Sequence, residues 1–221
     1  MGQPSVFSVR DRRMLREMLT GLTRSVGVMA FVEEGQEEPV SALLAEVEAL
    51  SRGVVGARIE RAEDALGALL SVTRMPSFRF SGVGGDILPI EMVGLPTGYQ
   101  FGAFLALLTS VSRGRPGLGH GVVGALKNLT HNVYLEVLVT ATCPNCPQVV
   151  RLAQQFALAN PARIHMASVD ALQCPGPNGI DRVPWTRLFV DGVMQSERAG
   201  MVSAPELFRW LQTTVRGGTA S

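Results

Sequence analysis

The strongest constraint on the fold of this chain is an internal repeat, in which the second half follows the order of the first at an offset of 108 residues. Pro39 corresponds to Pro147 and Pro76 to Pro184, and each pair lies at the same place in a predicted element. A repeat of this length indicates one structural unit used twice. Two unrelated α/β segments of similar size are the alternative, but they give no reason for this gap-free correspondence.

Apolar spacing predicts helices and strands in the same order in both halves. In the first half we expect helices at 11–24, 40–50, 62–70 and 101–111, and strands at 26–32, 57–60, 78–82 and 87–93. In the second half we expect helices at 122–129, from the turn at 143–146 to 159, and at 204–213, and strands at 133–140, 163–169, 186–190 and 193–197. The sequence therefore predicts two α/β units, residues 1–114 and 115–221, each with a central mixed sheet flanked by helices.

Composition and charge argue against several classes of function. A net charge of +1 over 221 residues gives no electrostatic basis for binding nucleic acid or an anionic membrane. The N-terminus lacks the apolar core of a signal peptide, and no apolar run reaches the roughly 18 residues of a membrane span. We therefore expect a cytoplasmic protein, in which three cysteines do not form a structural disulfide framework.

The residues that carry chemistry are Cys143 and Cys146, spaced C-x-x-C between a predicted strand and a predicted helix. The intervening Pro144 and Asn145, together with the preceding Thr142, form the turn that supports them. Proline is tolerated in the first turn of a helix because its missing N–H would have no partner there. At the equivalent positions the first half has a glycine and an acid, so we expect one active half and one without thiol chemistry.

The position of the dithiol predicts different roles for its two sulfurs. A thiolate at a helix N-terminus faces unpaired N–H groups and the positive end of the helix dipole, so we expect a lowered pKa for Cys143. Cys146 lies one turn deeper and should be more buried. The predicted reaction is attack by Cys143 on a substrate disulfide, followed by resolution of the mixed disulfide by Cys146.

The main alternative for a C-x-x-C pair is a metal site. Tetrahedral zinc would need two further ligands, usually as a second spaced pair. The candidates do not form such a pair with one another: Cys174, His120, His131 and His165. We therefore expect no metal and no organic cofactor, and a redox-active Cys143–Cys146 disulfide in their place.

Several motifs together resemble a known family. They are Thr142–Val150 around the dithiol, Leu158–Pro161, Arg182–Gly192 and, in the first half, Gly94–Phe101. The pattern resembles protein disulfide oxidoreductases built of two tandem thioredoxin-like folds, and it is most similar to the N-terminal domain of the flavoprotein component of alkyl hydroperoxide reductase. The resemblance implies a cis peptide bond between Val183 and Pro184, with the Val183 backbone free to pair with a substrate. A proline that merely starts an edge strand is the alternative.

The resemblance also implies a function, namely a thiol–disulfide oxidoreductase that relays electrons and reduces a peroxiredoxin-like or other protein disulfide. We expect no dinucleotide-binding module within the chain, so the electrons would come from a separate flavin-dependent reductase. A disulfide oxidant or isomerase, and a non-catalytic binding module with the same fold, are the alternatives. The expected partners do not include nucleic acid or a membrane.

Some positions depart from the family pattern. Thioredoxins carry a buried acid where this chain has Val137, and the flavoprotein domains tend to carry a carboxylate where it has Gln100. The proton acceptor for Cys146 therefore stays unassigned. Cys174 lies in a loop that could reach the dithiol, where it could be glutathionylated or link two chains, but we expect a free, inert cysteine. We expect Trp185, beside Pro184, in the core.

Overall fold

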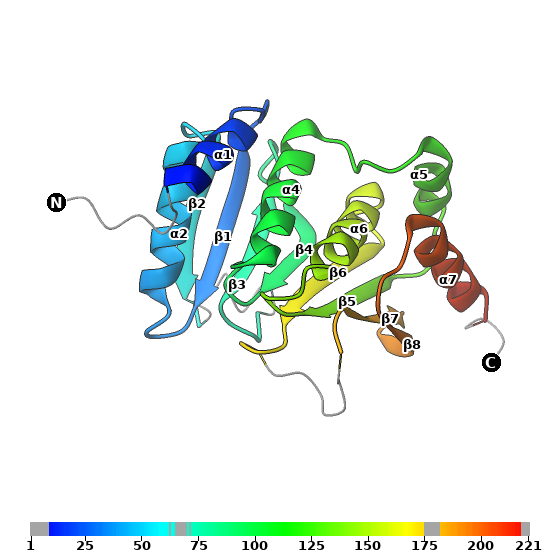
Figure 1. The fold of residues 1–221 in the computed structure, drawn as a ribbon. Helices are drawn as coiled ribbons and strands as arrows, with labels where there is room; N and C mark the ends of the chain where they lie inside the picture. Colours follow the sequence, from blue (N-terminus) through cyan, green and yellow to red (C-terminus); the bar gives the residue numbers. More distant parts are fainter. Residues whose placement is uncertain (1–8, 62, 65–69, 71, 175–181, 218–221) are drawn as a thin grey trace.

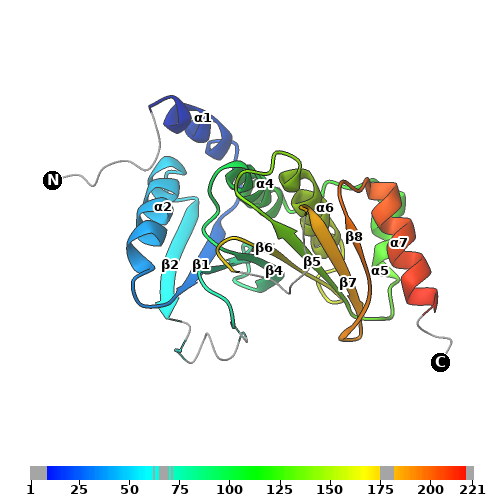
Figure 2. The same cartoon turned by 60° about the horizontal axis from the view of Figure 1, so that its bottom comes forward.

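The computed structural model describes residues 9–61, 63–64, 70, 72–174 and 182–217. One mixed sheet of eight strands, in the order β2-β1-β3-β4-β6-β5-β7-β8, runs through the whole molecule (Figure 1). In Figures 1 and 2, α4 and α6 lie side by side over the middle of this sheet, with α2 toward one end and α7 toward the other. The helices therefore cover the sheet from one half of the chain to the other.

The elements follow the predicted order. Those of the first half are α1 (Val9–Leu19), β1 (Val26–Val32), α2 (Glu37–Leu50), β2 (Val55–Arg61), β3 (Ser77–Ser81), β4 (Ile87–Val93) and α4 (Tyr99–Arg113). Those of the second half are α5 (His120–Lys127), β5 (Val133–Val139), α6 (Cys146–Ala159), β6 (Ile164–Asp170), β7 (Trp185–Val190), β8 (Val193–Ala199) and α7 (Ala204–Gly217). Of the helix predicted at 62–70, residues 62 and 65–69 lie outside the described residues, and residues 63, 64 and 70 are in turns or bends.

Helices α1 and α4 differ from prediction at their ends for local reasons. The first helix ends at Leu19 rather than residue 24, because the amides of Thr23 and Arg24 both donate to the Ser112 hydroxyl oxygen, at 2.8 and 2.9 Å, and so leave the helix. Helix α4 is longer than predicted at both ends. It lies between Gly98 and Gly114, which have φ of 54° and 63°, backbone conformations that favour glycine.

The sheet repeats its own topology. Strands β2-β1-β3-β4 of the first half have the same relative order as β6-β5-β7-β8 of the second. The halves join where β4 pairs in parallel with β6, from Ile90 opposite Met166 to Val93 opposite Val169. The predicted α/β fold with a mixed sheet is confirmed. The division at residues 114 and 115 falls in the loop between α4 and α5 and stays a prediction, because one sheet crosses it.

Aromatic packing anchors α4 on the first half of the sheet. Phe104 is fully buried, with its ring centroid 6.3 Å from that of Phe78 and 5.7 Å from that of Phe80, both on β3. Phe101, one turn earlier on α4, stacks on Phe104 at 5.9 Å. Fully burying a phenylalanine side chain contributes about 1.5–3 kcal/mol. This cluster therefore fixes the position of α4, whose N-terminus reaches the second half.

One glycine pattern matches a dinucleotide-binding loop in its spacing but not in its structural setting. Residues Gly119 to Gly124 do have the G-x-G-x-x-G spacing of dinucleotide-binding loops. Such a loop connects a strand to a helix, but α5, which begins at His120, follows α4 and a loop. A Cβ added at Gly119, Gly121 or Gly124 would meet no atom within 4 Å, so no close approach requires glycine there. The spacing therefore gives no support for a nucleotide site.

Candidate functional site

Cys143 and Cys146 form a disulfide at the turn between β5 and α6, with their Cα atoms 5.5 Å apart. Cys146 is fully buried, as predicted, and Cys143 is half-buried. An attacking thiol can therefore reach the sulfur of Cys143, whereas the sulfur of Cys146 is shielded by the core.

Helix α6 begins at Cys146, three residues later than the sequence suggests. The turn comes first, because the Cys143 amide donates to the Thr140 carbonyl oxygen at 3.2 Å. The N-cap residue Asn145 makes no side-chain cap, and the Cys146 amide instead lies 3.1 Å from the Cys143 sulfur, which takes the place of a capping oxygen. This contact brings the sulfur to the helix N-terminus, where negative charge is stabilised.

The proline loop faces the disulfide. The Val183–Pro184 peptide bond is cis, as the resemblance implies, and the Val183 carbonyl oxygen lies 3.9 Å from the Cys143 sulfur. The pairing of β7 with its neighbours begins at Trp185, so the Val183 backbone stands outside the strand ladder. The Gly200 amide donates to the Pro184 carbonyl oxygen at 2.7 Å. An extended substrate could therefore pair with Val183 beside the disulfide.

The first half supports the dithiol turn directly. At the N-terminus of α4, the Tyr99 amide donates to the Ala141 carbonyl oxygen at 2.9 Å. A Cβ at Gly98 would overlap that same oxygen, so the close approach requires glycine. In the sequence this segment stands out only for its resemblance, because no local pattern shows that it meets residues about 40 positions away.

Gln100 is a further residue of this contact. Its side chain is 3% exposed, and its amide group donates to the Thr140 carbonyl oxygen at 3.3 Å. Its own carbonyl oxygen is buried and has no hydrogen-bond partner in the described part of the chain. A buried acceptor without a partner is costly, and such groups concentrate at functional sites. Gln100 is therefore part of the site, where its side chain holds the Thr140 carbonyl just before the dithiol turn.

The acid next to Val137 lies on the opposite face of β5. Val137 is fully buried under the helices, whereas Glu136 accepts ion pairs from Arg74 at 2.9 Å and Arg187 at 3.2 Å. These guanidinium partners occupy both of its carboxylate oxygens. We therefore do not assign Glu136 as the proton acceptor for Cys146.

The third cysteine lies beside the proline loop of the first half. The half-buried Cys174 thiol donates to the Met75 carbonyl oxygen at 3.4 Å, and burial raises its pKa. It is free, as expected. Trp185 lies at the edge of the core: it is half-buried and packs against the smaller hydrophobic cluster that contains Leu138 and Val169. Its indole N–H donates to Glu197 at 3.0 Å.

Two further observations bear on the alternatives. Across the described ranges, no group of three or more histidine, cysteine, aspartate or glutamate side chains is placed to hold a metal ion. In the same residues, no helix is long and apolar enough to cross a membrane.

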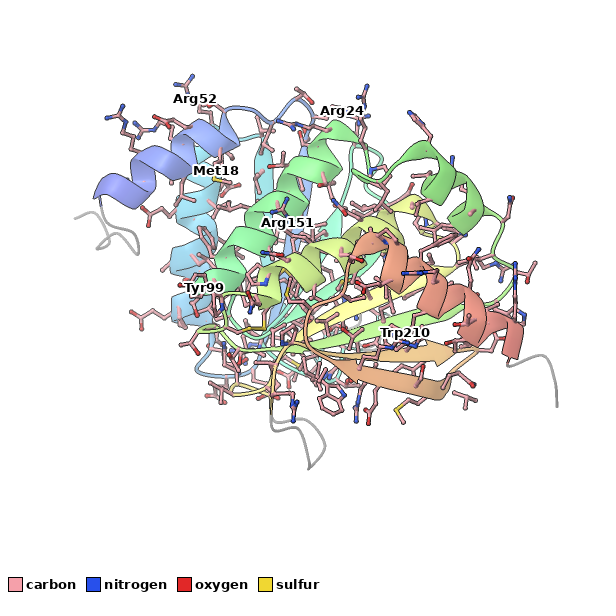
Figure 3. The ribbon with its side chains drawn as sticks, turned by 45° about the vertical axis from the view of Figure 1, so that its right-hand side comes forward. Met18, Arg24, Arg52, Tyr99, Arg151 and Trp210 are labelled. Atoms are coloured by element: carbon pink, nitrogen blue, oxygen red, sulfur yellow. A yellow bond between two sulfur atoms is a disulfide. The ribbon has the colours of Figure 1, made fainter. Side chains whose placement is uncertain are left out.

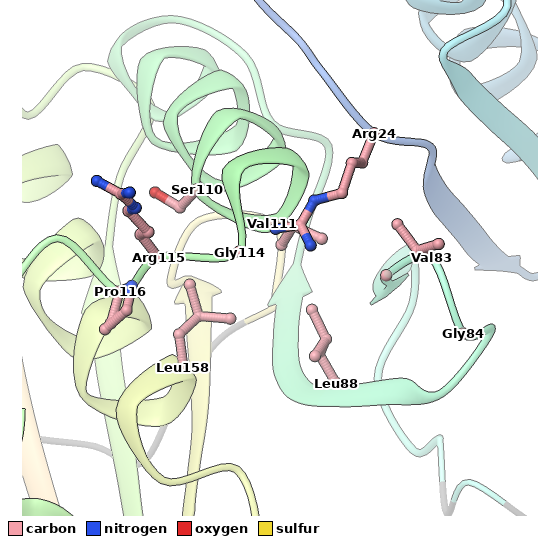
Figure 4. Close-up of a pocket in the computed structure, with 11 residues that line it drawn as sticks. Arg24, Val83, Gly84, Leu88, Ser110, Val111, Gly114, Arg115, Pro116 and Leu158 are labelled. Carbon is pink, nitrogen blue, oxygen red and sulfur yellow. The ribbon is translucent and has the colours of Figure 1, made fainter.

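A hollow at the far end of the helices is separate from the dithiol. It lies where α4 ends, and its walls include Leu88, Val111 and Leu158, with Arg24 and Arg115 at its rim (Figure 4). The dithiol lies where α4 and α6 begin. The hollow therefore takes no part in the site.

Comparison with known proteins supports the same fold. No protein-family model matches the chain. The NTD_N/C domain of alkylhydroperoxide reductase AhpF from Enterococcus faecalis superposes with a TM-score of 0.81 at 21% identity, over 93% of this chain and 99% of that one. A protein disulfide oxidoreductase from Aeropyrum pernix superposes with a TM-score of 0.79 at 24% identity, over 95% and 94%. The predicted thioredoxin-like fold is thereby confirmed.

Curated relatives match part of the chain. A NADH dehydrogenase from Bacillus subtilis is 28% identical over 134 residues, which are 61% of this chain and 25% of that protein. The F component of alkyl hydroperoxide reductase in Staphylococcus aureus is 27% identical over 95 residues, 43% of this chain and 18% of that one. The chain thus spans a quarter or less of these relatives.

Proposed function

We propose that this chain relays electrons by thiol–disulfide exchange and reduces a disulfide in a partner protein, with a peroxiredoxin as the first candidate. The observation that carries the proposal is the Cys143–Cys146 disulfide, which has one sulfur accessible beside the Val183 carbonyl and the other fully buried. This asymmetry suits one attacking and one resolving cysteine. The names of the alkyl hydroperoxide reductase relatives favour a peroxide-linked partner.

The proposed cycle moves two electrons. The Cys143 thiolate attacks one sulfur of the partner disulfide, which breaks that bond and releases the partner's other sulfur as a thiolate. The Cys146 thiol gives up its proton and attacks the Cys143 sulfur as a thiolate, which releases the second partner thiolate and forms the intramolecular disulfide. The partner thiolates take up protons according to their pKa values. A flavin-dependent reductase, as a separate module, then returns two electrons to the disulfide.

The residues of the turn and the proline loop have supporting roles in this proposal. Thr142, Pro144 and Asn145 hold the turn that presents Cys143, and Val183 offers its backbone to the partner beside Pro184. We place the reaction in the reducing cytoplasm, where a dithiol reductant can be kept reduced. The cycle uses the protein's own disulfide and no other cofactor.

The decisive test is the reduction potential of the Cys143/Cys146 pair, measured by alkylation and mass analysis after equilibration with defined thiol buffers. We expect a value near the thioredoxin range, about −270 mV, which makes the protein a reductant. A value of about −120 to −180 mV would assign it to the oxidants and isomerases instead. If no reversible intramolecular disulfide forms, the redox function is wrong and the protein is a binding module.

A second experiment tests the partner class. The reduced protein is mixed with an oxidised peroxiredoxin and, separately, with an unrelated disulfide protein such as insulin. Faster reduction of the peroxiredoxin supports the candidate. If both disulfides are reduced at equal rates, the protein is still a disulfide reductant, but it has no preference for a peroxiredoxin.

A further inference from the structure

From the surface beside the dithiol we infer that the groove between α4 and α6 binds the chain segment next to the partner's reacting cysteine, and that this segment carries an acidic side chain. The inference rests on the proposed function and names the chemistry of its substrate. The groove is lined by residues of both halves: Gly102, Ala106, Thr109, Arg113, Arg151 and Gln154.

The position of the groove connects it to the reacting sulfur. Helix α4 begins at Tyr99, whose amide is bonded to Ala141, two residues before Cys143. Helix α6 begins at Cys146. The groove therefore begins about one turn beyond the dithiol, at Gly102 on α4 and Arg151 on α6. Tyr99, 54% exposed, lies between the dithiol turn and the groove at the start of α4. Figure 3 shows Tyr99 near the start of α6 and Arg151 between the two helices.

The shape of the groove suits an extended chain. At Gly102, which is exposed, an added Cβ would meet no atom within 4 Å, so there is open space above this residue. Ala106 follows one turn later with a small side chain, and Met18, 47% exposed, adds an apolar contact at the far side. The hollow measures about 310 Å³, at the small end of ligand pockets. An enclosed small molecule is therefore a poorer fit than a segment lying along the surface.

The charge of the groove points to an acidic occupant. Arg151 and Arg113 contribute two exposed guanidinium groups, and none of the lining residues is acidic. Within the described ranges, no carboxylate forms an ion pair with either arginine, although other arginines of the chain are paired. A carboxylate of the partner can form the ion pair that no carboxylate of the described residues forms with these two arginines.

The distance from the start of α6 to Arg151 sets the expected spacing between the partner's cysteine and its acidic residue. Arg151 follows Cys146 by five residues, so it lies about 8 Å along the helix at 1.5 Å per residue. An extended chain advances about 3.3–3.6 Å per residue. We therefore place the acidic residue about two to four positions from the partner's cysteine, a spacing that a peptide can test.

The test uses peptides that carry one cysteine in a mixed disulfide with a chromophoric thiol. One peptide has glutamate three residues from the cysteine, a second has glutamine there and a third has lysine. The reduced full-length protein is mixed with each, and release of the chromophore gives a second-order rate constant. We expect about three- to fivefold faster reaction of the glutamate peptide than of the glutamine peptide at low salt, and a smaller ratio at high salt.

Variants then assign the effect to the groove. Arg151→Ala should bring the ratio to about one, Arg151→Glu should favour the lysine peptide, and Arg151→Lys should keep most of the preference. Gly102→Leu, whose Cβ would meet no atom within 4 Å, places an apolar side chain in the groove and should slow all three peptides. Arg52→Ala is the matched control, since Arg52 is exposed and is not one of the residues that line the groove.

The outcomes separate the inference from the proposed function. If the wild-type protein reduces all three peptides at the same rate, or if Arg52→Ala changes the ratio as much as Arg151→Ala does, the groove is not the binding surface and the reductase function stands. If the protein reduces no peptide and no protein disulfide, the proposed function itself fails.

Discussion

The two halves keep the same proline loop and differ in the turn that faces it. In the first half the Met75–Pro76 bond is cis, and the Gly94 amide donates to the Pro76 carbonyl oxygen at 2.7 Å. In the second half the Val183–Pro184 bond is cis, and the amide of Gly200 makes the same bond to Pro184, also at 2.7 Å. The two halves therefore share the same backbone geometry at the proline loop.

The two turns differ in the group that accepts a hydrogen bond from a backbone amide. In the first half the Gly35 amide donates to the Glu37 carboxylate at 2.8 Å, and Arg61 pairs with the same side chain at 2.9 Å. The backbone amides of Glu37 and Gly35 hold the pKa of this carboxylate below its usual range. In the second half the Cys143 sulfur lies against the Cys146 amide. The fold thus supplies a place for an anion in both halves, and the side chain decides whether it reacts.

The largest effect on disulfide turnover is expected when the cysteines of the second half are replaced. Cys143→Ser should reduce disulfide turnover to the uncatalysed background, because the attacking sulfur of the dithiol is lost. Cys146→Ser should instead accumulate a mixed disulfide with the partner, which mass spectrometry detects. Cys174→Ser is the control and should keep the wild-type rate. A loss of turnover in that control would contradict the assignment of all redox chemistry to the second half.

A core substitution in the first half tests whether the halves unfold together. Phe104→Ala should lower the free energy of unfolding by about 3–5 kcal/mol. The chain has two tryptophans, Trp185 and Trp210, and both lie in the second half, so their fluorescence reports on that half alone. Because one sheet crosses both halves, we expect the fluorescence midpoint in urea to move with the circular dichroism midpoint. An unchanged fluorescence midpoint would show that the halves unfold independently.

A graft of the dithiol into the first half sharpens the comparison at the level of the turn. In Gly35→Cys/Glu38→Cys, the first new side chain is placed at φ of 89°, where an L-residue is strained. We expect the unfolding free energy to fall by about 1–2 kcal/mol relative to Glu38→Cys alone, measured in urea with the cysteines reduced. Equal stability of the two variants would mean that the turn adapts to a side chain.

The smallest expected effect concerns the β7–β8 hairpin. His131 and the Asn132 amide bond to Asp191 and hold the pKa of its carboxyl below the usual value. A lowered folded-state pKa gives stability that is present above the unfolded-state value and is lost as the pH falls through the folded-state value. The difference in urea midpoint between wild type and Asp191→Asn should therefore be largest near neutral pH and shrink below about pH 4. A constant difference down to about pH 2.5, well below the usual aspartate pKa, would contradict this.

The sequence permitted prediction of the elements and the dithiol but not of their long-range contacts. The repeat, the strands and the burial of Cys146 follow from spacing and position. The cis bond at Pro184 does not follow from residues, since cis X–Pro bonds are about 5–6% of such bonds in folded proteins, and it came from the resemblance.

The contacts of the dithiol turn with α4 could not be predicted for a physical reason. Gln100 and Tyr99 meet Thr140 and Ala141 only because the two halves share a sheet. Apolar alternation marks a strand but does not say which edge strands will pair. The β4–β6 pairing could therefore not be predicted from the sequence. For the same reason, the contacts that the first half makes with the dithiol turn could not be predicted.

The β4–β6 pairing has a consequence for any attempt to divide the protein. A cut in the loop between α4 and α5 would leave β4 at the edge of one fragment and β6 at the edge of the other, each with unpaired backbone groups. Each fragment alone would be prone to aggregation, yet the two edges are complementary along four residue pairs. Mixed during refolding, the fragments would reassemble as a split protein whose disulfide reactivity reports their association.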